Sequence, residues 1–127
     1  MDSPSSLRIL LIERNASLRL SLERSLRSRG AQVRACANAR DARAAAPDFR
    51  PDVVLAEAAE LDALRGLDGV RERGAGAVIA MLEAGSAARP DAVVSLQKPF
   101  TAERLDQAIG AASRLRRRGP PLSPPAG

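Results

Sequence analysis

Residues 7–12 read Leu-Arg-Ile-Leu-Leu-Ile, and this stretch decides the fold class. Arg8 is its only polar residue, whereas a strand with one face in water would alternate apolar and polar side chains. A strand that is buried on both faces is typical of parallel sheets that carry helices on both sides. Residues 7–12 therefore predict the first strand of an α/β domain.

Strand-like and helix-like patterns alternate along the rest of the chain. Apolar or alternating runs predict further strands at 31–37, 53–56, 77–82 and 92–96, and apolar stripes predict helices at about 16–29, 39–46 and 60–72 and after Thr101. Asn15 or Ser17 is expected to cap the first helix, Gly30 to end it, and Pro47 to end the second. Right-handed crossovers would assemble these elements into a five-stranded parallel sheet with helices on both faces.

The chain is expected to hold one folded unit. Its 127 residues, 45% of them hydrophobic, suit a single core. Residues 1–6 are polar and predict a disordered leader, 7–115 the domain, and 116–127, rich in Arg and Pro, a disordered tail.

Composition excludes several kinds of site. The sequence has no His, Tyr or Trp, which argues against imidazole chemistry and aromatic stacking platforms. Cys36 is the only cysteine, so an internal disulfide and a zinc site of several cysteines are excluded, and a reducing compartment is favoured. No apolar run is long enough for a signal peptide or a membrane span, and we expect a cytoplasmic protein.

In open parallel sheets the functional crevice lies beyond the carboxyl ends of the strands. The residues that follow the predicted strands include Glu13, Arg14, Glu57, Leu82, Glu83 and Lys98. Residues 96–101 read Leu-Gln-Lys-Pro-Phe-Thr, and Lys98 is the only lysine of the chain. This arrangement resembles the response-regulator receiver family, whose members carry a Lys-Pro-Phe turn after the fifth strand. The resemblance implies a flavodoxin-like three-layer sandwich with strand order 2-1-3-4-5.

The resemblance also implies a damaged phosphoryl-transfer site. Active receivers use an acidic pair after the first strand to hold Mg²⁺ and an aspartate at the end of the third strand to accept the phosphoryl group. Glu13 matches the first acid, but Arg14 replaces the second and Glu57 replaces the phosphoacceptor. Because a hard Mg²⁺ ion needs carboxylate oxygens and a guanidinium would repel it, we predict no Mg²⁺ site, no other cofactor and no phosphorylation of Glu57.

This chain also differs from the family at the positions of the switching residues. The family's switch hydroxyl falls on Leu82 or Glu83, and its aromatic rotor falls on Ser95. The segment between the fourth strand and Lys98 is shorter than in the family, which predicts a reduced fourth helix. We expect Glu13 and Glu57 to face Arg14 and Lys98 in a cluster without net charge, with one negative charge left over if Glu83 also points inward.

These features predict a degenerate receiver that is not an enzyme and that binds proteins in phosphorelay-type signalling without being phosphorylated. The expected partner surface is the face of the fourth helix, fifth strand and fifth helix, including parts of 86–96 and 105–113, and a homodimer is compatible with it. One alternative is that Glu57 is still phosphorylated or imitates the phosphorylated state. Another is nucleic-acid binding through Arg114 and 116–118, although such a run is more often a solvated helix end.

Overall fold

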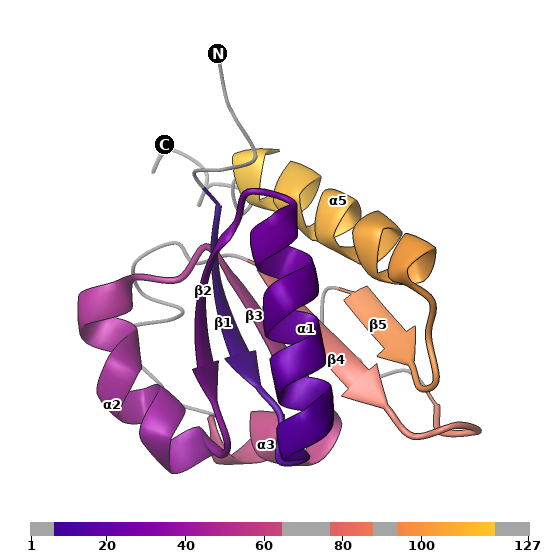
Figure 1. Cartoon of the computed structure of the whole chain (residues 1–127), viewed down its shortest axis with the longest axis horizontal. Coiled ribbons are helices and arrows are strands. Elements are labelled where there is room, and N and C mark those ends of the chain that lie inside the picture. The colour runs from indigo at the N-terminus through magenta and orange to yellow at the C-terminus, as the bar shows by residue number, and fades with distance from the viewer. Residues whose placement is uncertain (1–6, 65–76, 88–93, 119–127) are drawn as a thin grey trace, which may run out of the picture.

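A computed structural model describes residues 7–64, 77–87 and 94–118 of the chain. Strands and helices alternate along it (Figure 1). Their bounds are β1 (Arg8–Ile12), α1 (Ala16–Ser28), β2 (Gln32–Cys36), α2 (Ala39–Phe49), β3 (Val53–Glu57), α3 (Ala58–Ala63), β4 (Ala77–Leu82), β5 (Val94–Gln97) and α5 (Ala102–Arg118).

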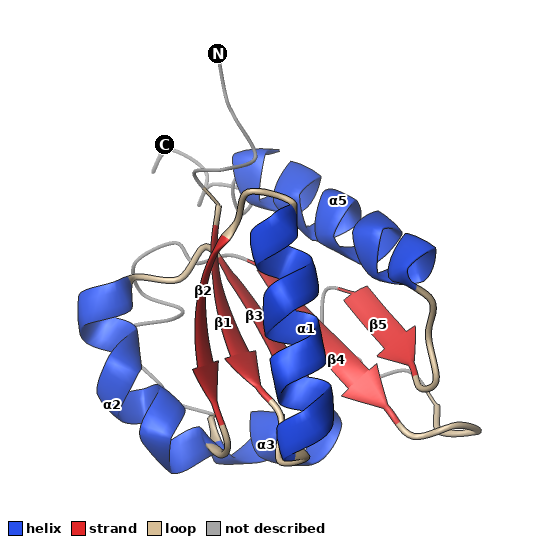
Figure 2. Ribbon diagram, viewed as in Figure 1, coloured by secondary structure: helices blue, strands red, loops and turns tan. Residues whose placement is uncertain are grey.

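The strands form one parallel sheet with the order β2-β1-β3-β4-β5 (Figure 2). Leu11 of β1 lies beside Leu55 of β3, and Leu55 lies beside Ile79 of β4. This order and direction confirm the flavodoxin-like three-layer fold that the sequence predicts. It also brings the carboxyl ends of β1, β3 and β4 to one edge of the sheet.

Two core layers explain why β1 is apolar at consecutive positions. Leu10 and Ile12 pack in the layer that α2 and α3 cover, whereas Ile9 and Leu11 pack in the layer that α1 and α5 cover. All four side chains have no exposed surface. Because successive strand residues point to opposite faces, only a strand covered on both sides buries such a run completely.

The first helix has the two ends that its sequence predicts. The Asn15 side chain accepts a hydrogen bond from the Leu18 N–H at 2.9 Å, which satisfies a donor that the helix itself leaves open. Gly30 has a φ of 92°, a left-handed conformation that a glycine adopts without a steric penalty. The cap is therefore Asn15 rather than Ser17.

The second helix does not end at Pro47 but continues to Phe49, so the predicted end is wrong. A proline in a last turn removes a single backbone hydrogen bond, since its fixed φ is itself helical. Packing outweighs that loss, because Ala46 is fully buried and Phe49 packs against the same core layer. Arg50, with a φ of 52°, then closes the helix.

The last helix is also longer than expected. It runs to Arg118, three residues past the predicted domain end at 115, so the tail boundary at 116 is wrong. Arginine has a high helix propensity and its charge is favourable at a helix C-terminus, which explains the continuation. The predicted disordered segments at 1–6 and 119–127 lie outside the described residues.

The remaining boundaries shift by small amounts. Helix α3 begins at Ala58, directly after β3, whereas we predicted 60–72; residues 65–76 lie outside the described part. Strand β5 ends at Gln97, one residue later than predicted. Residues 83–87 form a turn with a φ of 86° at Gly85. The predicted short fourth helix falls mainly on 88–93, which are not described.

Strand β4 supplies a stability test of this packing. We expect Ile79→Ala to lower the free energy of unfolding by about 2–5 kcal/mol, because Ile79 is fully buried between β3 and β5. Leu20→Ala is the control, since Leu20 is 47% exposed and its truncation should change stability by less than about 0.5 kcal/mol. Urea unfolding followed by circular dichroism measures both, and equal effects would contradict the described core.

Candidate functional site

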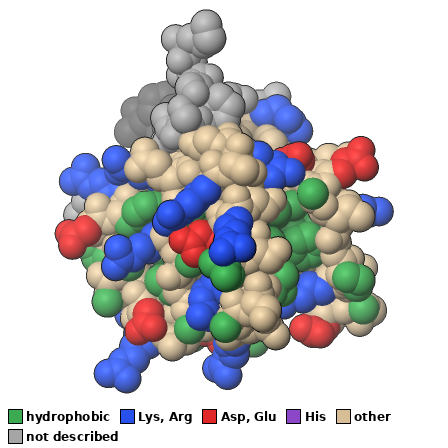
Figure 3. Space-filling model, viewed as in Figure 1, with side chains coloured by type: hydrophobic (Ala, Val, Ile, Leu, Met, Phe, Trp, Pro, Cys, Tyr) green, Lys and Arg blue, Asp and Glu red, His purple; other side chains and the backbone are tan. Residues whose placement is uncertain are grey.

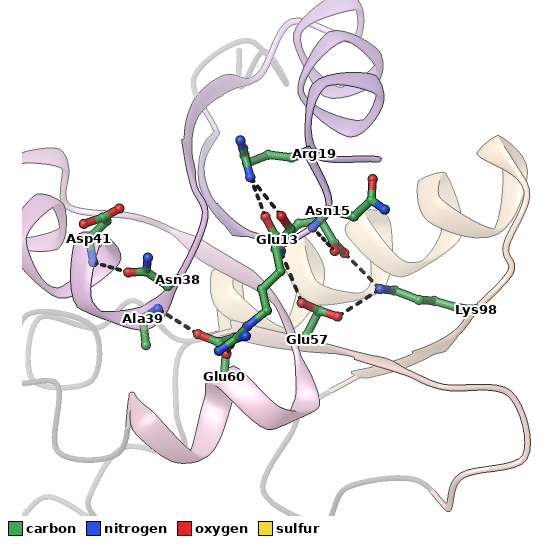
Figure 4. Close-up of polar contacts among 10 residues, drawn as sticks. Glu13, Asn15, Arg19, Asn38, Ala39, Asp41, Glu57, Glu60 and Lys98 are labelled. Atoms are coloured by element: carbon green, nitrogen blue, oxygen red, sulfur yellow. Dashed lines mark hydrogen bonds and ion pairs between the residues drawn. The ribbon is translucent and has the colours of Figure 1, made fainter. Parts of the chain in front are cut away.

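Three charged side chains from different strands meet beyond the carboxyl end of the sheet. Glu13 follows β1, Glu57 ends β3 and Lys98 follows β5. The Lys98 Nζ atom lies 2.9 Å from Glu13 Oε1 and 3.2 Å from Glu57 Oε2 (Figure 4). The structure thus brings together three residues that the sequence singles out, although they are far apart in the chain.

The cluster is largely removed from water. Glu13 is 1% exposed, and the Lys98 and Glu57 side chains are 19% and 21% exposed. Burial alone would lower the pKa of the Lys98 ammonium group, but hydrogen bonds to Glu13 and Glu57 outweigh it and raise the pKa above its ordinary value of 10.5. Lys98 is therefore held firmly in its charged form.

Both carboxylates accept hydrogen bonds from donors of the chain. Glu13 Oε2 accepts the Asn15 N–H at 3.0 Å, and Glu57 Oε1 accepts the Arg14 N–H at 3.2 Å. Since Lys98 donates to the other oxygen of each acid, all four carboxylate oxygens accept a hydrogen bond.

Arg14 does not join the cluster through its side chain, and this corrects the predicted charge balance. Its side chain is 74% exposed, and its Nε atom lies 3.3 Å from Glu60 Oε2. Only its backbone N–H reaches Glu57. Two carboxylates therefore face one ammonium group, which leaves one formal negative charge in the cluster instead of none.

Glu60 explains where the guanidinium goes, and the sequence prediction missed it. Glu60 is 7% exposed, and its Oε1 atom accepts the Ala39 N–H at the start of α2, at 2.8 Å. A carboxylate is favourable at a helix N-terminus, and its second oxygen remains available to Arg14. The available signal was its position three residues after Glu57, in the first turn of the helix that follows β3.

A second missed residue, Arg19, secures the chain just after β1. Its Nη1 atom donates to the Glu13 carbonyl at 2.9 Å and to the Arg14 carbonyl at 3.4 Å (Figure 4). Arg19 lies one turn into α1, where the fold brings it back over the end of the strand. This contact helps to fix the backbone that presents Glu13.

The remaining candidate positions lie apart from the cluster. Leu82 is buried at the end of β4, and its carbonyl accepts the Lys98 N–H at 2.7 Å. Glu83 is exposed in the following turn and adds no charge to the cluster. Ser95 is exposed on β5. The assignment of these three positions to the family's switch residues remains a prediction.

Two further properties concern ligands and membranes. Within residues 7–64, 77–87 and 94–118, no group of three or more His, Cys, Asp or Glu side chains is arranged to hold a metal ion. In the same ranges, none of the helices is both long and apolar enough to cross a membrane.

The sequence matches no protein-family model and no curated protein. Solved structures resemble it more closely. The chemotaxis protein CheY4 of Vibrio cholerae is 18% identical, with a TM-score of 0.72 over 84% of this chain and 98% of that one. A CheY-like response regulator receiver domain protein from Methanospirillum hungatei is 19% identical, with a TM-score of 0.75 over 89% and 98%.

A response regulator receiver modulated diguanylate cyclase from Pelobacter carbinolicus is a third similar structure. It is 22% identical, with a TM-score of 0.73, and the match covers 89% of this chain and 97% of that one. Likeness at these identities concerns the fold. The chain has the fold of CheY-like receiver domains, with a Glu13-Lys98-Glu57 cluster at the carboxyl edge of its sheet.

The single lysine allows a direct test of the cluster. We expect the Cε NMR signal of Lys98 to titrate with a midpoint above 10.5, because Glu13 and Glu57 stabilise the ammonium form. Glu57→Gln should move the midpoint toward the ordinary value, and Asp106→Asn, which lies on α5 and pairs with Arg29, should not. An unchanged midpoint in Glu57→Gln would contradict the described contact.

The same contact predicts a pH-dependent stability. Lys98→Met should destabilise the protein by about 3 kcal/mol at pH 7, since it leaves the buried Glu13 without its cation. Because the folded pKa of Lys98 is raised, its contribution is complete below pH 10.5 and is lost as the pH rises through the folded pKa.

Urea unfolding of the wild type and Lys98→Met between neutral and strongly alkaline pH measures this difference. Arg24→Met serves as the control, since Arg24 is exposed on α1 and its loss should cost less than about 0.5 kcal/mol. A gap between wild type and Lys98→Met that persists undiminished at the alkaline end would contradict the assignment.

Proposed function

We propose that this chain is a degenerate receiver domain of phosphorelay-type signal transduction, which binds protein partners without being phosphorylated and is not an enzyme. The observation that carries the proposal is the occupation of every carboxylate oxygen of Glu13 and Glu57 by donors of the chain. A phosphoryl-transfer site needs some of these oxygens for Mg²⁺ and for the incoming phosphoryl group.

The donor set does not fit Mg²⁺. Glu13 and Glu57 are the carboxylates of the cluster, and Arg14, at the position of a second acid after β1, places its guanidinium on Glu60. A hard divalent cation is held by several oxygen ligands, and the position that would supply another carboxylate after β1 is occupied by Arg14. We therefore propose that the Mg²⁺ site is absent in this protein.

Glu57 is poorly placed to act as a nucleophile. One of its oxygens accepts the Arg14 N–H and the other contacts Lys98, so both are stabilised as hydrogen-bond acceptors. Its extra methylene, compared with aspartate, also moves the carboxylate away from the strand end. The Lys98 contact instead holds Glu57 in one arrangement. In this arrangement Glu57 occupies the position that a phosphorylated aspartate would take in an active receiver.

We propose that partners bind at the face of β5 and α5. On this face Leu105, Ala108 and Ala112 are buried against the sheet, whereas Ser95 and Gln97 are exposed. Residues 88–93, which complete the expected surface, are not described. Alternatively, a second copy of this chain binds at the same face and forms a homodimer.

The buried free thiol of Cys36 supports a reducing compartment, and we place the protein in the cytoplasm.

Mass spectrometry of the intact protein tests the absence of phosphorylation. After incubation with acetyl phosphate and Mg²⁺, we expect no phosphoryl adduct, because the oxygens of Glu57 are engaged and the metal ligands are missing. An active receiver domain treated in parallel shows that the donor works. An adduct that disappears in Glu57→Ala would overturn the proposal.

A further inference from the structure

An open groove runs along the outer edge of β2, between α1 and α2. Its volume is about 510 Å³, and its charged lining consists of Arg19, Arg34 and Asp41. The rest of the lining is small: Ala35 of β2, Ala37 just after it, Ala44 and Ala45 of α2, and Cys36. The groove lies at β2, and β5 is at the opposite edge of the sheet (Figure 1). The groove is therefore separate from the face proposed above.

The groove exposes a strand edge that can accept another strand. Gln32 N–H donates to the Leu7 carbonyl and the Cys36 carbonyl accepts from Glu13 N–H, so even-numbered residues of β2 bond to β1. In a parallel ladder the alternate residues, 33 and 35, then turn their backbone groups outward. Arg27 Nη2 donates to the Val33 carbonyl at 3.1 Å, which leaves Ala35 as the open position at the groove.

The small side chains that border the groove leave the edge of β2 accessible to another strand. Beside Ala35 the groove is bordered by Ala37 on the strand side and by Ala44 and Ala45 on the helix side. Side chains of this size leave room for a second backbone to approach to the spacing of neighbouring strands, about 4.8 Å. Edge strands are normally shielded by bulges, prolines or covering segments, and the described part of the chain places none of its strands on this side of β2.

The charge of the groove indicates which kind of ligand it binds. Arg34 is exposed and, among the described residues, its guanidinium has no ion-pair partner, while Arg19 uses only Nη1 in its bonds to the chain. Against these two cations stands one acid, Asp41, so the groove is positive. Figure 3 shows basic side chains spread over the face seen in that view, with acidic ones between them. A second copy of this chain would bring like charges together, which disfavours it as the occupant.

We propose that this groove binds an extended acidic segment of a partner protein, which adds to β2 as a strand at Ala35 and places carboxylates on Arg19 and Arg34. The inference rests on the proposed function in one respect, namely that the chain acts by binding proteins. Val33 and Ala35 pack toward α1 and Cys36 toward α2, so Arg34 lies on the α2 side and Arg19 on the α1 side. Because successive strand residues point to opposite faces, two consecutive acidic residues would reach both arginines.

The probe is a displayed library of random linear peptides selected on the full chain. We expect the recovered peptides to contain paired Asp or Glu residues next to β-branched or small residues, and their binding to weaken as salt is raised. Fluorescence anisotropy of the best peptide then compares variants. Arg34→Glu should weaken binding by about tenfold or more, and the matched control Arg24→Glu, exposed on α1 outside the groove, should leave it unchanged.

Ala35→Pro tests the strand pairing itself. Proline removes the outward N–H of residue 35 and leaves the bonds of residues 32, 34 and 36 to β1 in place, so peptide binding should be lost while urea unfolding remains cooperative. If this variant fails to fold, Arg34→Glu still decides the matter. Recovery of no acidic peptide, or binding that survives Arg34→Glu, would overturn the groove as a docking site.

The two proposals fail in different ways. Peptides whose binding responds to Gln97→Arg on β5 and not to Arg34→Glu would leave the protein-binding role intact and overturn the groove. A phosphoryl adduct on Glu57 would overturn the proposed function whatever the peptides do.

Discussion

The ion pairs of Lys98 with Glu13 and Glu57 are the interactions on which the carboxyl end of the sheet depends. The ammonium group of Lys98 joins the residue after β1, the last residue of β3 and the loop after β5 through contacts of 2.9 and 3.2 Å. Glu13 is 1% exposed, and burying a carboxylate is costly unless a cation or hydrogen-bond donors pair with it. The energetic role of the pair is to compensate a buried charge rather than to add net stability, which is why removing one partner is expected to be costly.

Backbone groups complete the hydrogen bonding around this pair. Backbone N–H groups of Arg14 and Asn15 fill the carboxylate oxygens that Lys98 does not reach, and these donors come from the turn that enters α1. The guanidinium of Arg14 meets Glu60, which itself caps the start of α2. One continuous set of polar contacts therefore ties β1, β3, α2 and α3 together with groups of the chain alone.

The sheet has two outer strands, β2 and β5, and they offer different chemistry. The β2 edge has an open backbone position between arginines, whereas the β5 side carries exposed polar residues next to α5. The two surfaces proposed for partner binding therefore lie on opposite edges of one sheet.

The sequence by itself determined the layered α/β fold, the strand order through the receiver resemblance, and the meeting of Glu13, Glu57 and Lys98, because strand hydrophobicity and the position after each strand are local properties. Helix ends such as Phe49 and Arg118 were missed, since tertiary packing and end effects outweigh the local signals at Pro47 and residue 116. Only the tertiary structure decided the charge balance of the cluster. Arg14 and Glu60 are far apart in the chain, and the direction of a long side chain depends on which partner the fold brings within reach.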